Sequence, residues 1–138
     1  MSGHELVRPS RDGDQFHYHW AARQCLKLLP GQTDLVAITI EGASAKEDES
    51  DEIEAGEQLI DVGLYFGAES LHKARLIRYI QLKHSTRAAN EPWTASGLKK
   101  TIKGFAERYV QLVERFNDAD VIQRFRFEFI TNRPIETK

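Results

Sequence analysis

The sequence predicts a single α/β domain with elements in the order α-β-β-β-α-β and a central mixed sheet flanked by helices. Two long segments with helical spacing of apolar residues and four short segments rich in β-branched or aromatic residues predict this class. The chain has 138 residues with 41% apolar content, enough to bury one core. We therefore treat residues 1–138 as one domain.

The two helices are predicted from apolar spacing. The first covers residues 14–29 and ends at Pro30-Gly31, a pair that cannot continue a helix. The second covers residues 92–116. Its apolar residues recur at alternating steps of three and four and predict one continuous stripe, made of Leu98, Ile102, Phe105, Tyr109, Leu112 and Phe116.

Four strands are predicted, over residues 35–40, 58–66, 77–84 and 125–130. Alternate residues of a strand share one face, and in the third strand these are Ile77, Tyr79, Gln81 and Lys83. His84 then points to the opposite face, where we expect it to contact the core or a helix.

Polar residues should meet at one end of this sheet. If the first three strands form an antiparallel meander, the end of the first, the start of the second and the end of the third lie together. The residues at these positions are Glu41, Asp61, Gln81 and Lys83. Polar groups inside apolar strands need partners when buried, and a shared metal ion would supply one.

The residue types favour a magnesium site. Magnesium prefers oxygen ligands and keeps several waters, so a few protein oxygens suffice. Asp61 offers a carboxylate, Gln81 a side-chain carbonyl and Leu82 a backbone carbonyl, while Glu41 is the natural extra acid. Lys83 shares the strand face of Gln81 and could orient or deprotonate a water and offset developing negative charge.

The net charge of −2 conceals an uneven distribution. Of 19 basic and 21 acidic residues in the chain, the stretch 44–57 holds one lysine and seven acids, which leaves 18 basic and 14 acidic residues elsewhere. We expect the stretch to be a solvated acidic loop inserted in a mildly basic body. The lysines early in the second helix could hold DNA phosphates or could form an ordinary solvated face; they are Lys99, Lys100 and Lys103.

Composition also suggests where the protein works. Cys25 is the only cysteine, which excludes an internal disulfide and fits a reducing compartment. No apolar run approaches the ~20 residues needed to span a bilayer, and the polar N-terminus does not look like a signal peptide. We expect a soluble, cytoplasmic protein without a membrane partner.

At the motif level the chain resembles the restriction-endonuclease-like PD-(D/E)XK superfamily, in the variant where glutamine replaces the second acid. Asp61, the triplet Gln81-Leu82-Lys83 and the element order carry this likeness. The segments GDQFHYHWAARQCL, TIEG, IDV, YIQLKHS, EPWTASGLKKTIKGFAERY and ITNRP resemble, more closely, the double-stranded DNA endonuclease domain of bacterial antiphage defence proteins. Such domains sit at the N-terminus of CBASS effectors and STAND-type NTPase sensors.

The resemblance implies a DNA endonuclease dependent on Mg²⁺, with Mn²⁺ as a substitute, in the bacterial cytoplasm. It implies that Asp61 and Gln81 bind the metal and that Lys83 is the catalytic lysine. It also implies that residues 1–138 are the N-terminal part of a larger protein, whose C-terminal sensor region activates cleavage by forming a homo-oligomer. Many members add a residue from the first helix, and Asp14 and Gln15 are both candidates here.

Two other functions remain open on the sequence. A domain with this fold can bind nucleic acid without cutting it. Alternatively, the alternating segment FRFEF, at residues 125–129, can form an exposed strand edge through which the chain assembles with a partner or with itself.

Overall fold

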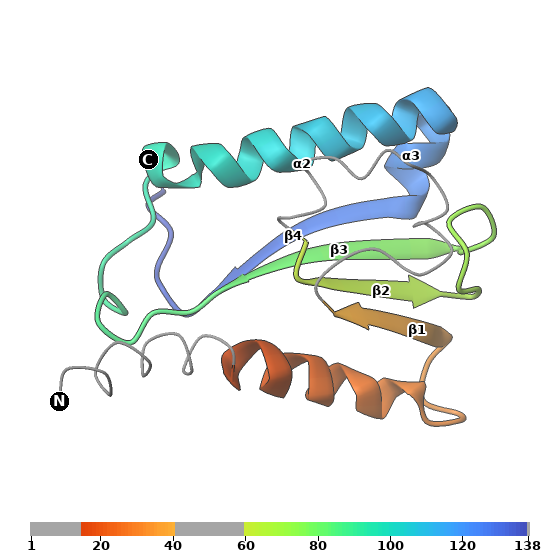
Figure 1. The fold of residues 1–138 in the computed structure, drawn as a ribbon, viewed down its shortest axis with the longest axis horizontal. Helices are drawn as coiled ribbons and strands as arrows, with labels where there is room; N and C mark the ends of the chain where they lie inside the picture. The colour runs from red at the N-terminus through yellow and green to blue at the C-terminus, as the bar shows by residue number, and fades with distance from the viewer. Residues whose placement is uncertain (1–14, 41–59, 138) are drawn as a thin grey trace, which may run out of the picture.

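The computed structural model describes residues 15–40 and 60–137 (Figure 1). A helix over residues 15–25 opens the described part of the chain. The remaining elements are the 3-10 helix η1 (Leu26–Leu28), the strands β1 (Leu35–Ile40), β2 (Val62–Phe66) and β3 (Leu76–Lys83), the helices α2 (Ala95–Arg115) and α3 (Asp118–Arg124), and the strand β4 (Phe125–Thr131). The predicted α/β class is confirmed.

The four strands form one mixed sheet in the order β1-β2-β3-β4. β1 pairs with β2 and β2 with β3 in antiparallel fashion, which confirms the predicted meander, and β4 runs parallel to β3. Helices α2 and α3 cover one face of the sheet, and the helix over residues 15–25 covers the other (Figure 1). The sheet therefore lies between two helical layers.

Several predicted boundaries were wrong. The second strand was predicted over residues 58–66, but β2 begins at Val62, so Ile60 and Asp61 lie before it. The third was predicted over residues 77–84, but β3 runs from Leu76 to Lys83. The first helix stays α-helical only to residue 25 and then tightens into η1. Helix α2 begins at Ala95 rather than at residue 92, because the Thr94 side chain accepts a hydrogen bond from the Gly97 N–H and caps it. It ends at Arg115.

Helix α3 was not predicted. It has only seven residues, too few for apolar periodicity to be recognised. A local signal was nevertheless present, since Asn117 caps the helix by accepting from the Asp120 N–H, and Asp118 and Asp120 lie in its first turn.

The predicted apolar stripe of α2 was also wrong in part. Ile102 is 59% exposed, and the buried positions of the helix are Thr101, Gly104, Arg108 and Leu112. Two of these side chains are polar, and both find partners on β3: Thr101 donates to Gln81, and Arg108 donates to the Tyr79 hydroxyl. The polar groups of the sheet therefore help decide which side of α2 faces inward.

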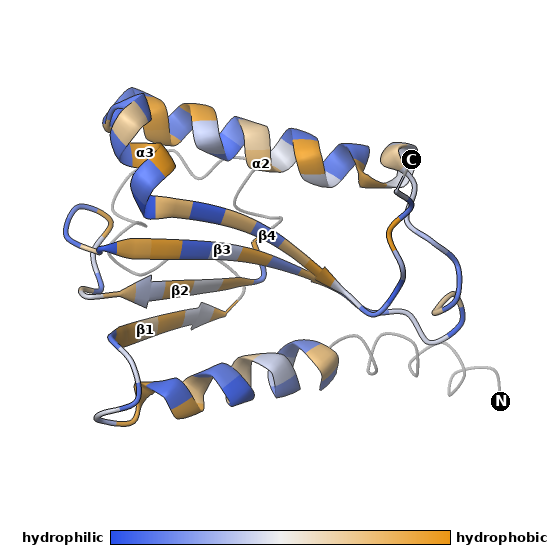
Figure 2. Cartoon of the chain, turned by 180° about the vertical axis from the view of Figure 1, so that it is seen from behind, coloured by the Kyte–Doolittle hydropathy of each residue, from blue (hydrophilic) through white to orange (hydrophobic). Residues whose placement is uncertain are grey.

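The sheet separates two apolar cores. One lies under α2 and α3 and includes Tyr65, Ile77, Tyr79, Leu112 and Phe125; the other lies against the helix over residues 15–25 and includes Ala21, Val62, Leu64, Ile80 and Leu82. Strongly hydrophobic colour runs along much of the sheet, whereas the helices carry more hydrophilic residues (Figure 2). Among the described residues, no helix combines the length and apolar character required to cross a membrane.

Candidate metal and nucleic-acid site

The end of β1, the start of β2, the end of β3 and the start of α2 lie at the same end of the molecule (Figure 1). The register Ile40↔Val62↔Ile80 sets this arrangement. Asp61 directly precedes Val62 and Gln81 directly follows Ile80, so in the antiparallel pair both lie beyond the same end of the ladder. These two candidate ligands are thus neighbours across two chain segments. Glu41, the predicted extra acid, lies outside the described residues, as does the acidic stretch 44–57.

Asp61 is fixed to β3 by both its backbone and its side chain. Its N–H donates to the Ile80 carbonyl at 2.9 Å, and its Oδ2 accepts from the Leu82 N–H at 2.7 Å. The Asp61 side chain therefore extends the hydrogen bonding between β2 and β3 beyond the last paired residues, Val62 and Ile80. A carboxylate offers about four acceptor positions, so this hydrogen bond does not exhaust the group.

Gln81 is directed toward α2. The residue is 2% exposed, and its Oε1 accepts from the Thr101 hydroxyl at 2.6 Å; Thr101 is itself 8% exposed. The predicted second ligand is therefore an amide oxygen that already has one buried donor. An amide oxygen has two lone pairs, and the hydroxyl occupies one of them.

The backbone of Leu82 is held from two sides. Its N–H donates to Asp61, and its carbonyl lies 3.0 Å from His17 Nε2, which donates in the tautomer that carries its proton there. The sequence predicted this carbonyl as a further metal ligand, which stays a prediction; in the structure the carbonyl has a histidine neighbour. Sequence reasoning missed His17, because nothing in a helical pattern marks a histidine that reaches a backbone carbonyl.

Lys83 is exposed at the last position of β3, two residues after Gln81. The next residue, His84, stacks on Phe16 of the helix over residues 15–25, with ring centroids 4.8 Å apart. This contact confirms that His84 packs against a helix. Lys83 therefore stays at the surface while its neighbours anchor the strand end.

The three lysines predicted to bind DNA lie in the first half of α2, and all are exposed. Lys103 is 3.9 Å from Glu107, an exposed pair one helical turn apart, whereas Lys99 and Lys100 precede it. Gln15, a candidate auxiliary residue, is exposed at the start of the first helix, and Asp14 lies outside the described residues. The cationic part of α2 thus begins at the end of the molecule where Asp61 lies.

A cluster of hydrogen bonds, not predicted from the sequence, joins the segments that leave β3 and β4. Asn132 exchanges two hydrogen bonds with the backbone of Ser85, at 2.7 and 2.9 Å. Trp93 donates from its indole to the Thr131 hydroxyl at 3.0 Å, and the Arg133 guanidinium lies 4.1 Å from the centre of the Trp93 ring. These contacts fix the start of α2 relative to the ends of both strands.

The donor chemistry of the site fits a hard divalent cation. Asp61 and Gln81 supply one carboxylate and one amide oxygen from adjacent segments, and magnesium completes a shell of this kind with water. Within residues 15–40 and 60–137, no group of three histidine, cysteine, aspartate or glutamate side chains lies close enough to hold a metal ion. A cation here would therefore bind through few protein ligands.

Comparison with known proteins adds no assignment: no protein-family model matches the chain, and no curated protein matches it.

Proposed function

We propose that this protein is a magnesium-dependent endonuclease that hydrolyses phosphodiester bonds of double-stranded DNA, built on a restriction-endonuclease-like core. The observation that carries the proposal is the adjacency of Asp61 and Gln81 at the end of the β2–β3 pair, with Lys83 exposed two residues further on.

The topology supports this assignment. The resemblance calls for an α-β-β-β-α-β core with a mixed sheet, and the described residues follow that order with α3 added before β4. In such a core the acid at the start of the second strand and the glutamine-x-lysine triplet at the end of the third must meet. Antiparallel pairing of β2 with β3 brings the segments carrying Asp61 and Gln81 together.

Each residue of the site has a distinct task. Asp61 and Gln81 hold the cation through oxygen atoms, and Glu41 assists as a further acid. Lys83 places a compact positive charge beside the scissile phosphate and orients the attacking water. Bound Mg²⁺ supplies an activated water and offsets negative charge on the phosphate.

The rest of the protein supports binding and control. Lys99, Lys100 and Lys103 contact DNA phosphates from α2, as exposed lysines on one helix can do. Cutting both strands requires either a partner subunit or two successive events. We propose that a homo-oligomer, formed through the C-terminal sensor region that the resemblance implies, supplies the second site. We assign the protein to antiphage defence in the bacterial cytoplasm on the family resemblance.

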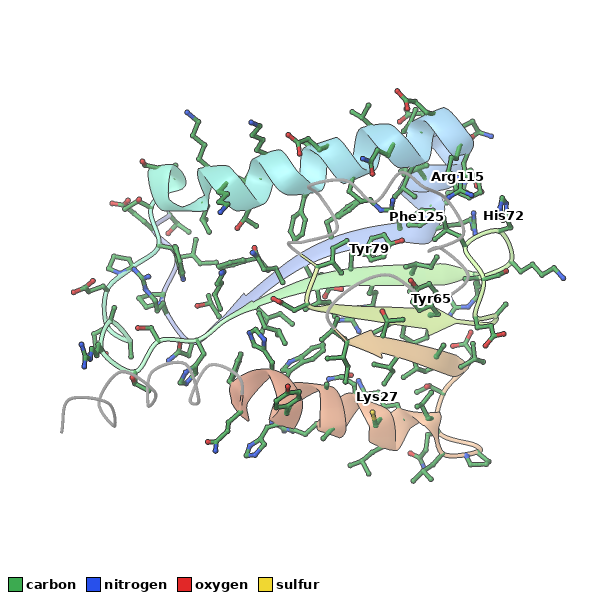
Figure 3. The ribbon with its side chains drawn as sticks, viewed as in Figure 1. Lys27, Tyr65, His72, Tyr79, Arg115 and Phe125 are labelled. Atoms are coloured by element: carbon green, nitrogen blue, oxygen red, sulfur yellow. The ribbon has the colours of Figure 1, made fainter. Side chains whose placement is uncertain are left out.

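The experiment is cleavage of supercoiled plasmid by the chain fused to a dimerising tag, with Mg²⁺, with Mn²⁺ and with EDTA. The test variants are Asp61→Asn, which keeps an acceptor for the Leu82 N–H, and Lys83→Ala. Matched controls are Glu114→Gln on the exposed side of α2 and Lys73→Ala in the β2–β3 connection. His72 of that connection lies at the opposite end of the sheet from the start of α2 (Figure 3).

We expect metal-dependent nicking and linearisation that falls about 100-fold or more in both test variants and stays near wild type in both controls. Cleavage that survives in Lys83→Ala would show that this site is wrong. Cleavage unaffected by EDTA would remove the metal from the mechanism.

A second candidate is a module that binds nucleic acid or self-assembles without cutting DNA. The observation in its favour is the burial of Gln81 against Thr101, which is also what a purely structural glutamine would show. In addition, β4 is an edge strand of the sheet that the described residues form, and an edge strand can pair with another chain. DNA binding or self-association by a dimerised wild type that cuts no DNA with either metal would favour this candidate.

A further inference from the structure

We propose that the outward side of α2 is an interface through which two copies of this chain pair, with the two helices antiparallel and crossing at Ala106. This inference goes beyond the proposed function, and it depends neither on metal binding nor on cleavage. It gives a role to an apolar surface that the two cores leave exposed.

Apolar side chains follow the outward side of α2. Ile102 and Val110 are 59% and 55% exposed, and the exposed Ala106 lies midway between them in the sequence. Residues four apart on a helix are neighbours on its surface, so these three form one continuous stripe. Neither apolar core of the described residues includes any of them. Single exposed apolar residues are common on proteins, whereas a continuous exposed stripe is typical of a contact surface.

An open hollow in the surface lies along this stripe. It has a volume of about 630 Å³, and Ala106 and Val110 form its apolar part. The rest of its lining is charged or polar and consists of Lys103, Glu107, Gln111 and Glu114. Because the side chains at the contact set how closely two helices pack, the small Ala106 allows a second helix to approach here.

Charge is distributed unevenly along the same side of α2. Lys99 and Lys103 precede Ala106, and Glu107 and Glu114 follow it. Steps of four, four and seven residues place all four on one flank of the stripe. An antiparallel second copy sets the lysine half of one helix against the glutamate half of the other. A parallel copy would set like halves level with each other.

A two-fold axis through Ala106 satisfies the apolar and the charged pattern together. Ile102 and Val110 are each four residues from Ala106, so Ile102 of each copy meets Val110 of the other. On the flank, Lys103 of each copy lies near Glu107 of the other, and Lys99 lies near Glu114. The surface is therefore complementary to itself, which favours a second copy of this chain over an unrelated partner.

Pairing covers the flank of α2 that carries Lys99 and Lys103. On the proposed function these lysines also contact DNA phosphates, and this one consequence rests on that function. The pair is then a state of the protein without DNA, distinct from the oligomer proposed to form through the C-terminal sensor region.

The experiment is sedimentation equilibrium of the untagged chain, without DNA or metal, over a range of micromolar concentrations. The test variant is Ile102→Glu. Its matched control is Ile122→Glu, because Ile122 lies on the helix α3 and is also 59% exposed. Circular dichroism checks the fold of each variant, and Val110→Glu replaces Ile102→Glu if that variant does not fold.

Two further variants test the charge pairing. Lys103→Glu and Glu107→Lys, each alone, set like charges opposite each other across the two-fold axis, whereas a mixture of the two variants restores opposite charges. Lys73→Glu, at an exposed position of the β2–β3 connection, controls for the change in net charge.

We expect a reversible monomer–dimer equilibrium in wild type that Ile102→Glu weakens about 10-fold or more and Ile122→Glu leaves unchanged. Lys103→Glu and Glu107→Lys should each weaken pairing, Lys73→Glu should not, and the mixture should pair better than either component.

A wild type that stays monomeric throughout overturns the interface and leaves the nuclease proposal intact. A dimer that survives Ile102→Glu, or equal losses in Ile102→Glu and Ile122→Glu, places the contact elsewhere and also overturns it. A mixture that pairs no better than its components overturns the antiparallel arrangement.

Discussion

The Asp61 carboxylate accepts a hydrogen bond from the Leu82 backbone N–H, 2.7 Å away, where the β2–β3 ladder has already ended. The acid proposed to anchor the metal is thus also part of the structure that holds β3 in place. Substitutions at Asp61 can therefore separate the effect of its charge on cleavage from the effect of its hydrogen bond on stability.

Asp61→Asn should abolish cleavage while barely changing the free energy of unfolding, because an asparagine oxygen can still accept from the Leu82 N–H. Asp61→Ala should lower that free energy by about 1–3 kcal/mol, since it leaves a half-buried N–H without its partner. Urea unfolding of the three proteins measures the difference. Equal stability of the two variants would mean that the hydrogen bond contributes nothing.

The lysines of α2 should set the salt dependence of DNA binding. Replacing Lys99 and Lys100 by alanine should weaken binding to all DNA sequences alike and reduce the slope of log affinity against log salt by about one for each lysine. Fluorescence anisotropy with a labelled duplex at several salt concentrations tests this. Lys27→Ala is the control, because Lys27 lies in η1, on the side of the sheet away from α2 (Figure 3). An unchanged slope would place the DNA elsewhere.

Gly63 should not tolerate a side chain. A Cβ atom there would lie 2.6 Å from the Thr39 Oγ1 and 3.1 Å from the Tyr65 ring, inside the sheet. We expect Gly63→Ala to cost about 1–3 kcal/mol of unfolding free energy, as overpacking usually does. Thr39→Ala should recover part of the loss when combined with it. Additive effects of the two changes in chemical denaturation would count against the clash.

Acid should weaken one surface contact, between the residue that precedes β1 and the residue that precedes β3. The Arg75 guanidinium donates two hydrogen bonds to the Asp34 carboxylate and holds the pKa of Asp34 below its ordinary value of 3.8. A lowered folded-state pKa adds stability above the unfolded pKa, and that stability is lost as pH falls through the folded one. Asp34→Asn should therefore flatten the fall in stability below about pH 4, measured by thermal unfolding from pH 6 to pH 2. The pair is exposed, so the effect should be small and should shrink in high salt.

Sequence reasoning succeeded where local chemistry decides the structure. The strand at residues 35–40 was predicted with its correct bounds because a β-branched run lies between turn signals. The neighbouring positions of Asp61 and Gln81 followed from the meander, since strand ends alone determine which residues meet.

Sequence reasoning failed where a residue's position depends on partners from distant segments of the chain. Arg108 is 5% exposed although its type favours solvent, because Tyr79 of β3 offers both a hydroxyl and a ring 5.4 Å from its guanidinium. His17 reaches Leu82, 65 residues away in the chain. Neither contact can be recognised from the spacing of residues along the chain. The side of α2 that faces the sheet, and the contact of the first helix with the Leu82 carbonyl, are therefore known only from the three-dimensional structure.

Two hydrogen bonds join Ser85, which follows β3, to Asn132, which follows β4. The Trp93 indole also donates to Thr131, the last residue of β4. The segments that follow the two strands therefore form one cooperative unit. Local opening of either segment must break the contacts of the other. Their backbone amides should consequently exchange hydrogen with solvent at a common rate, although Ser85 and Asn132 are 47 residues apart.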